Sequence, residues 1–329
     1  MTSNHEPAQL FCGYEAVLFL LADIGGTHTR MCLSRPDALG GVHVFDNANF
    51  TDLTALTTAF LADVDAAPAE LHGRFAVACP VEGDHVSLTN LDWHFTIPAL
   101  RNSLGLNSLQ VCNDFSALAL ALPWLDDSHV LRLTSGTALD RSTKLVLGPG
   151  TGLGVSALIP SGDDWIAVAG EGGHVSFAPQ NEFETRLLES LWQRFEHVSA
   201  ERVLAGPGLA LTYRVIGELE QGTGAELAPQ EVVARARAGE SRAQRTLDIY
   251  FAMLGSVAGD LALTLGALGG VFLAGGILPR TVEELNRSRY REAFVAKGRM
   301  RDYLSQIPSY LVVHPYPALL GLLHAREIP

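Results

Sequence analysis

Lysine is almost missing from this sequence. Of the 23 basic residues only Lys144 and Lys297 are lysines, and the others are arginines. Chemistry that depends on a lysine is therefore nearly excluded, including Schiff bases, pyridoxal phosphate sites and the lysine of the Walker loop. The 36 acidic residues leave a formal net charge of −13, which opposes binding to nucleic acid and docking on an anionic membrane.

Cysteine is also scarce, and none of the four cysteines belongs to a C-x-x-C pair, so neither a zinc ribbon nor a redox dithiol is expected. The first 15 residues lack the basic start and apolar core of a signal peptide, so we expect a cytoplasmic protein with reduced thiols. The apolar stretch 253–278 has the length of a membrane span. Because it contains Asp260 and seven glycines, we expect a buried helix followed by a buried strand.

Strand-like apolar runs alternate with helical segments, which predicts an α/β fold with a mostly parallel core. The length of 329 residues favours about two domains, and a change of unit is expected near 123–143, where Pro, Asp, Ser and Thr collect. The expected strands cover 16–22, 31–33, 74–79, 109–112, 144–147, 157–159, 271–274 and 310–313. The expected helices cover 51–64, 117–122, most of 181–265, and 317–326.

Glycine is plentiful, with 32 residues, and two glycine turns each follow a strand-like run. The first turn contains Asp23, Gly25, Gly26 and Thr27, and the second contains Gly150, Thr151 and Gly152. Glycine permits backbone conformations that point amide N–H groups at an anion, and Asp23 could reach a Mg²⁺ ion directly or through water. Either turn alone is also typical of a plain hairpin. Together they indicate a phosphate chain held from both sides without lysine.

Asn113 and Asp114 lie at the end of a strand-like run, just before a helix. In open α/β sheets this edge of the sheet binds ligands. Asp114 could simply cap the helix. Alternatively, it could accept a proton from a substrate hydroxyl that Asn113 orients.

Three further motifs have both a functional and a structural interpretation. Glu171 and His174, separated by two glycines, could bind the hydroxyls of a polyol or lie in an ordinary surface loop. Ser199 is expected to cap a helix whose first turn carries Glu201, an acid that also suits the helix dipole. The pair Gly275-Gly276 follows a buried strand, and it permits either close approach of a flat ring such as adenine or tight packing of a strand on a helix.

Six segments occur in one order along the chain: ADIGGTHTR, CNDFSALA, GPGTGLGVS, GEGGHVSFAP, HVSAERVLAGPGL and GGVFLAGGILPR. In this combination the sequence resembles the bacterial glucokinase family over about residues 17–329. The resemblance implies an α/β, two-domain actin-like ATPase (ribonuclease H-like) fold with an interdomain cleft. It implies an N-terminal extension at 1–16, expected to be disordered, a small domain at 17–124 and a large domain at 125–314. A helix within 315–329 is expected to return to the small domain.

The resemblance also implies ATP-dependent phosphorylation of the 6-hydroxyl of D-glucose, the first step of glycolysis, by a cytoplasmic homodimer that uses Mg²⁺ and no zinc. By motif matching, Asp114 looks like the catalytic base. The residues that look like ligands of the sugar are Asn113, Asp114, Glu171, His174 and Glu201. The residues that match the ATP-binding motifs are Asp23, Gly25, Gly26, Thr27, Gly150, Thr151, Gly152, Gly275 and Gly276, with Asp23 also expected to bind Mg²⁺ through water.

The sequence departs from related families at two points. The first phosphate motif commonly continues T-N-x-R, whereas here it reads Thr27-His28-Thr29-Arg30, which leaves the role of position 28 open. The zinc motif C-x-C-G-x-x-G-C of the related repressor–kinase (ROK) family is absent. Two alternatives remain: a hexose kinase that prefers mannose or an N-acetylhexosamine, and a sugar-sensing regulator without catalysis. The net charge of −13 and the presence of Asp114 disfavour the regulator.

Overall fold

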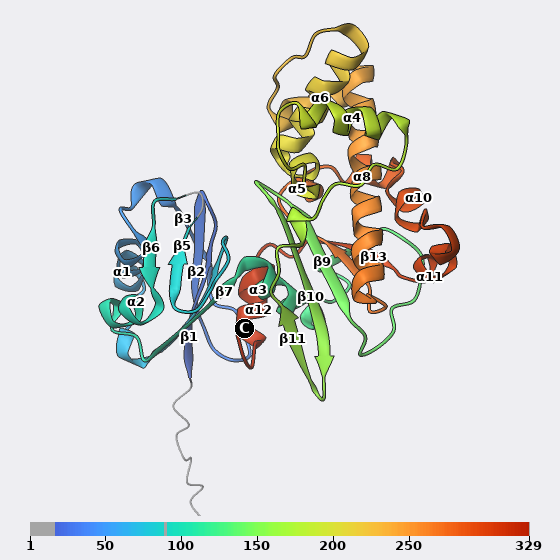
Figure 1. The fold of residues 1–329 in the computed structure, drawn as a ribbon. Helices are drawn as coiled ribbons and strands as arrows, with labels where there is room; N and C mark the ends of the chain where they lie inside the picture. The colour runs from blue at the N-terminus through green and yellow to red at the C-terminus, as the bar shows by residue number, and fades with distance from the viewer. Residues whose placement is uncertain (1–16, 89–90, 329) are drawn as a thin grey trace, which may run out of the picture.

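The computed structural model of the protein describes residues 17–88 and 91–328 (Figure 1). The expected extension at 1–16 lies outside these residues. In the described part of the chain a five-stranded sheet has the order β3-β2-β1-β4-β7. Its strands are β1 Leu18–Ile24, β2 His28–Ser34, β3 His43–Asp46, β4 Leu71–Val77 and β7 Ser108–Asn113.

A second, six-stranded sheet has the order β11-β10-β9-β12-β13-β8. Its strands are β8 Val130–Arg132, β9 Lys144–Pro149, β10 Leu153–Ser161, β11 Asp164–Val168, β12 Val271–Leu273 and β13 Ser309–Val312. A separate hairpin pairs β5 His85–Ser87 with β6 His94–Thr96. The expected strands within the described residues are all present, whereas β3, β5, β6, β8 and β11 are short and were not predicted.

The two sheets share one plan. In each, three strands pair antiparallel: β1, β2 and β3 in the first sheet, and β9, β10 and β11 in the second. Two further strands extend each sheet in parallel, β4 and β7 in the first and β12 and β13 in the second. The second sheet has one more strand, β8, which pairs antiparallel with β13. The prediction of a mostly parallel core was therefore wrong. The glycine turns after β1 and β9 are too short for a crossover, so each returns the chain as an antiparallel neighbour.

The bounds of the helices are α1 Leu53–Asp63, α2 Ile97–Leu104, α3 Asp114–Ala121, α4 Glu182–Trp192, α5 Ala200–Leu204, α6 Gly206–Gln221, α7 Pro229–Arg237, α8 Ser241–Leu265, α9 Val282–Arg287, α10 Tyr290–Val295, α11 Arg301–Ser305 and α12 Pro317–His324. Some helices pack on these sheets, such as α3 on β9 and β10, whereas α4, α6 and α7 pack mainly on other helices beyond the end of the second sheet (Figure 1). Two single 3₁₀ turns matter below, η1 Asn47–Asn49 and η4 Gly172–His174. The helix expected at 117–122 begins earlier, at Asp114.

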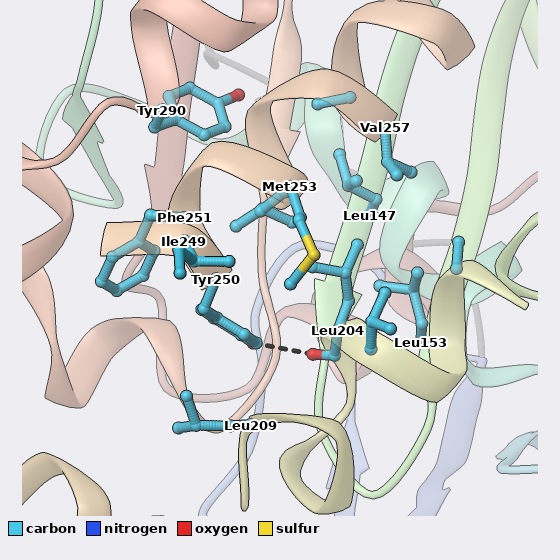
Figure 2. Packing of buried hydrophobic residues seen from close by; sticks show 14 of the residues in the cluster. Leu147, Leu153, Leu204, Leu209, Ile249, Tyr250, Phe251, Met253, Val257 and Tyr290 are labelled. Atoms are coloured by element: carbon cyan, nitrogen blue, oxygen red, sulfur yellow. Dashed lines mark hydrogen bonds between the residues drawn. The ribbon is translucent and has the colours of Figure 1, made fainter. Parts of the chain in front are cut away.

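Helix α8 is the one described helix that is long and apolar enough to cross a membrane, and 78% of its most apolar window is buried within the protein. It is followed by the buried strand β12, as the sequence predicted. Figure 2 shows α8 side chains packed among those of its neighbours, where the Tyr250 hydroxyl donates a hydrogen bond of 2.7 Å to the Leu204 carbonyl. This bond ties the end of α5, which carries Glu201, to the core.

Helices α3 and α12 lie side by side between the two sheets (Figure 1). One face of α3 joins Leu118 and Leu120 to residues of the second sheet, such as Phe272. Ala117 instead joins a cluster with Leu21 of β1 and Leu319 of α12. The N-terminus of α3 therefore lies where the two sheets approach each other.

Candidate active site

Three parallel strands of the first sheet end at one level. The register aligns Ile24 of β1 with Val77 of β4, and Val77 with Asn113 of β7. Asp23 and Asp114, each one residue from this level, are therefore brought to the same edge of the sheet. Asp23 and Asp114 are 91 positions apart in the sequence. They become neighbours because β1, β4 and β7 pair in parallel and in register.

Asn113, and not Asp114, caps helix α3. Its side-chain oxygen accepts hydrogen bonds from the amides of Phe115 at 2.9 Å and Ser116 at 3.3 Å, while its Nδ2 donates to the Cys79 carbonyl at 3.3 Å. The interpretation of Asp114 as the cap is therefore wrong. Asp114 is the first helical residue, and its carboxylate lies beside the positive end of the helix and accepts from the Phe115 amide at 2.9 Å.

The carboxylate of Asp114 has an unusual proton affinity. Burial raises its pKa, and the carboxylate of Asp23 raises it further, to about 7. Glu171 adds a smaller effect in the same direction. Burial also raises the pKa of Asp23, which is opposed by Arg30, whose Nη1 lies 3.5 Å from Asp23 Oδ2. The site thus contains carboxylates that repel one another, an arrangement that a cation would relieve.

The first glycine turn is closed by its own backbone and by a distant side chain. The Gly25 amide donates to the His28 carbonyl at 3.1 Å, and Nδ2 of Asn47 donates to the Gly25 carbonyl at 2.8 Å. Asn47 was missed by sequence reasoning. No local signal marks it, since it is 22 residues from Gly25 and lies in the short turn η1 after β3.

The second glycine turn meets the other glycine pair and a helix terminus. Within the turn, the Gly150 amide donates to the Gly152 carbonyl at 2.8 Å. The Gly150 carbonyl accepts from the amide of Gly206, the first residue of α6, at 2.9 Å. Gly275 has φ +88°, and a Cβ there would overlap the Pro149 carbonyl, so both conformation and space require glycine. Gly276 follows directly, with open space where a side chain would begin.

Glu171, His174 and Glu201 come together around turn η4. The His174 Nε2 lies 3.8 Å from Glu171 Oε2 and 4.0 Å from Glu201 Oε1. Ser199 caps α5 as predicted, by accepting from the Arg202 amide at 3.2 Å. Glu171 and His174 have more than half of their side chains exposed, at 55% and 57%. Their polar groups are therefore accessible to a ligand.

Glu201 also binds the second glycine turn, a contact that the sequence did not reveal. Its Oε2 accepts a hydrogen bond of 2.9 Å from the amide of Leu153. A Cβ at Gly152 would lie 2.5 Å from the same oxygen. Glu201 therefore joins the polar cluster around His174 to the turn that was predicted to hold phosphate.

Phe115 links the edge of the first sheet to strand β10, which directly follows the second glycine turn. The residue follows Asp114 in α3, and its ring lies against Gly154, where a Cβ would overlap the ring carbons. Because α3 also packs on β9 and β10, the position of Asp114 depends on the second sheet as well as the first.

The turns fit an anionic ligand accompanied by a cation. Within the described part of the chain, four amide N–H groups of the two turns have no acceptor, those of Gly26, Thr27, Thr151 and Gly152. Free amides at glycine turns are typical phosphate donors. The described residues contain no group of three or more metal-ligating side chains. A divalent cation would thus have to take its ligands from Asp23, water and a phosphate chain, the arrangement that Mg²⁺ favours.

Comparison with known proteins agrees with this geometry. The family model described as Glucokinase matches residues 20–327. A protein named Glucokinase from Paramagnetospirillum magneticum is 44% identical over 93% of this chain and 96% of its own length. A protein named Bifunctional protein glk from Paraburkholderia xenovorans is 44% identical over 92% of this chain, which spans about half (48%) of that longer relative.

Among solved structures, the crystal structure of a glucokinase from an Antarctic psychrotroph superimposes with a TM-score of 0.84 at 35% identity, covering 94% of this chain and 98% of the other. The expected two-domain actin-like ATPase fold is therefore confirmed. With its two glycine turns, its E-x-x-H turn and Asp114 arranged around the facing edges of two sheets, the chain belongs to the glucokinase family.

Proposed function

We propose that this protein transfers the γ-phosphoryl group of ATP to the 6-hydroxyl of D-glucose. The observation that carries the proposal is the position of Asp114. It lies beside Asp23 of the first glycine turn, and the next residue, Phe115, packs against Gly154 in the strand that follows the second turn. Membership of the glucokinase family supports glucose as the acceptor.

Asp114 is the proposed general base. A hydroxyl is a weak nucleophile, and a carboxylate that accepts its proton as the new O–P bond forms assists the transfer. The proton moves from the sugar 6-hydroxyl to Asp114, while the bond between the γ-phosphorus and the bridging oxygen of ATP breaks and ADP leaves. A pKa of about 7 suits this role, because the group is both deprotonated and basic near neutral pH.

The nucleotide would be held by backbone more than by side chains. The proposed phosphate donors are the free amides of the two glycine turns and the Thr27 hydroxyl, and the adenosine would lie at Gly275-Gly276. Mg²⁺ bound through Asp23 would neutralise charge on the transferring phosphate. Arg30, at 3.5 Å from Asp23, lowers the pKa of that carboxylate and so opposes the effect of burial, which raises it. This scheme requires no lysine, consistent with a sequence that has only two.

The sugar would be bound by Asn113, Glu171, His174 and Glu201. The structure limits what Asn113 can do, because its oxygen is occupied by the cap of α3. Nδ2 donates one hydrogen to Cys79 and retains the other for a sugar hydroxyl. Glu171 and Glu201 can accept from neighbouring hydroxyls, and His174 can donate to one.

We further propose that residues 17–124, with the helix in 315–329, form one domain, that residues 125–314 form the other, and that a cleft lies between them. Closure of the two on glucose would exclude water, which otherwise competes for the phosphoryl group. We also propose that the protein is a cytoplasmic homodimer, and light scattering of the purified chain would give the oligomeric state.

A coupled assay that crosses glucose, mannose, fructose and N-acetylglucosamine with ATP, ADP and polyphosphate tests the proposed reaction. We expect the highest kcat/KM for glucose with ATP, and no turnover when Mg²⁺ is chelated. A preference for mannose or N-acetylglucosamine would favour the alternative hexose kinase. Binding of glucose without turnover with any donor would favour the non-catalytic regulator.

Glu171→Ala is expected to raise the KM for glucose by about 10–100-fold, the effect of losing a hydrogen bond to a charged group. Because the side chain is 55% exposed, the melting temperature should change little. Steady-state kinetics with varied glucose and saturating ATP measure the effect. Glu189→Ala, an exposed acid on α4, is the matched control. A wild-type KM in the Glu171 variant would remove this residue from the sugar site.

The pKa of Asp114 predicts the pH dependence of the reaction. Only the deprotonated carboxylate accepts a proton, so kcat/KM for Mg·ATP should fall about tenfold for each pH unit below pH 7 and level off above it. A profile of this ratio from pH 5 to 9 gives the result, since it reports the enzyme before the cation and nucleotide bind. A flat profile down to pH 5 would show that Asp114 is ionised throughout or takes no proton.

A further inference from the structure

Asn47 makes three hydrogen bonds to the first glycine turn and the strand that follows it. Its Nδ2 donates to the Gly25 carbonyl at 2.8 Å, its Oδ1 accepts from the Thr29 hydroxyl at 2.8 Å, and its backbone amide donates to the Thr27 carbonyl at 2.9 Å. Asn47 is 2% exposed and Thr29 is fully buried. One buried residue thus holds the turn and the start of β2 at Gly25, Thr27 and Thr29.

These bonds determine where the turn points its amides. In a planar trans peptide the C=O and the following N–H point in opposite directions. Because Asn47 fixes the Gly25 carbonyl toward the protein interior, the Gly26 N–H must point away from it. This N–H has no acceptor within the described chain, nor has that of Thr27, which is exposed. The free Gly26 amide therefore owes its direction to a side chain behind the turn.

An amide side chain satisfies both partners in this place. The Gly25 carbonyl needs a donor, and the Thr29 hydroxyl uses an acceptor. Aspartate provides acceptors alone, and alanine provides neither. Without the Asn47 amide, the Gly25 carbonyl would have no donor. It would then turn toward water, and the peptide would rotate with it. His28, at the position where T-N-x-R commonly has asparagine, is exposed and meets Gly25 through its backbone carbonyl.

We propose that Asn47 is the positioning residue of the nucleotide site: by holding the Gly25 carbonyl, it orients the Gly26 amide toward the phosphates of ATP. This inference rests on the proposed kinase function. Asn47 touches neither substrate nor reacting atoms, so its effect should appear in nucleotide affinity and not in glucose affinity.

The test compares Asn47→Ala and Asn47→Asp with the wild-type chain. Calorimetry should show a Kd for Mg·ATP raised about 10–100-fold in both variants, since a misdirected amide loses a hydrogen bond to a charged phosphate. The Kd for glucose should stay within about twofold of the wild type. Asn49→Ala, an exposed asparagine at the other end of η1, is the matched control and should change neither affinity.

A merely structural role would lower the folded fraction and leave the Kd of the remaining folded protein unchanged for both ligands. That result, or a wild-type Kd for Mg·ATP in folded Asn47→Ala, would overturn the proposal. If neither Asn47 variant folds, Thr29→Val carries the test. It removes one bond to Asn47 and should raise the Kd for Mg·ATP at least severalfold, whereas an unchanged Kd would overturn the inference. A wild-type chain that binds Mg·ATP without phosphorylating glucose would contradict the proposed function and leave this test intact.

Discussion

Asp114→Ala is expected to lower kcat by about 10²–10⁴-fold, the usual contribution of a general base. Glucose should still bind, because the other proposed sugar ligands remain on separate elements, β7, η4 and α5. Steady-state kinetics give kcat, and calorimetry gives the Kd for glucose. Asp127→Ala, which removes an exposed acid after α3, is the control and should retain full activity. Activity within a few fold of the wild type would disprove the assignment of Asp114 as the base.

The same carboxylate should destabilise the fold at neutral pH. Asp114 titrates near 3.8 when unfolded and near 7 when folded, so between these values the folded chain retains a proton that the unfolded chain releases. The free energy of unfolding therefore falls as pH rises through this window. Asp114→Asn removes the effect, and it should be more stable than the wild type by on the order of a few kcal/mol above pH 7.

The difference in stability should be small at pH 4, where the wild-type carboxyl is protonated in the folded state. Urea unfolding of both proteins at pH 4, 6 and 8 measures it. An Asp114→Asn variant that loses kcat, and whose free energy of unfolding exceeds that of the wild type by more as pH rises, would show that the residue is retained for catalysis at a cost in stability. A variant equally stable at all three values would mean that the pKa of Asp114 is close to its ordinary value.

Gly154→Ala is expected to lower kcat by about 100-fold, the effect of moving a catalytic group by about 1 Å. The backbone at Gly154 is not in the left-handed region, so alanine is conformationally acceptable there. The added Cβ, however, would overlap the ring of Phe115. Since Phe115 directly follows Asp114, displacement of the ring should shift the proposed base relative to the phosphates.

Steady-state kinetics with glucose and ATP measure this effect, with Gly41→Ala as the control because its Cβ would meet open space. Combining Gly154→Ala with Phe115→Leu should recover part of kcat, since the smaller side chain vacates the overlapping volume. A single Gly154→Ala variant with kcat within twofold of the wild type would show that Asp114 is held independently of the second sheet.

The local elements were largely predictable from the sequence. Apolar runs located the strands on which the site is built, and the long apolar stretch after Met253 was correctly assigned to a buried helix and strand. Ser199 was correctly assigned as a helix cap, because capping depends on residues three positions apart. The start of α3 is ambiguous in the sequence because Asn113 and Asp114 are both good capping residues, and only the tertiary structure shows that Asn113 accepts the helix amides.

By itself, the sequence determined the chemistry that this protein has at its disposal: glycine turns without lysine, a carboxylate at a strand end, and a family pattern along nearly the whole chain. The tertiary structure alone decided how these parts are held. Asn47 lies behind Gly25, Glu201 binds the amide of Leu153, and Phe115 lies against Gly154, contacts that span 22, 48 and 39 residues. Such contacts have no local signature, because the pairing of strands and the packing of α3 between two sheets bring them together.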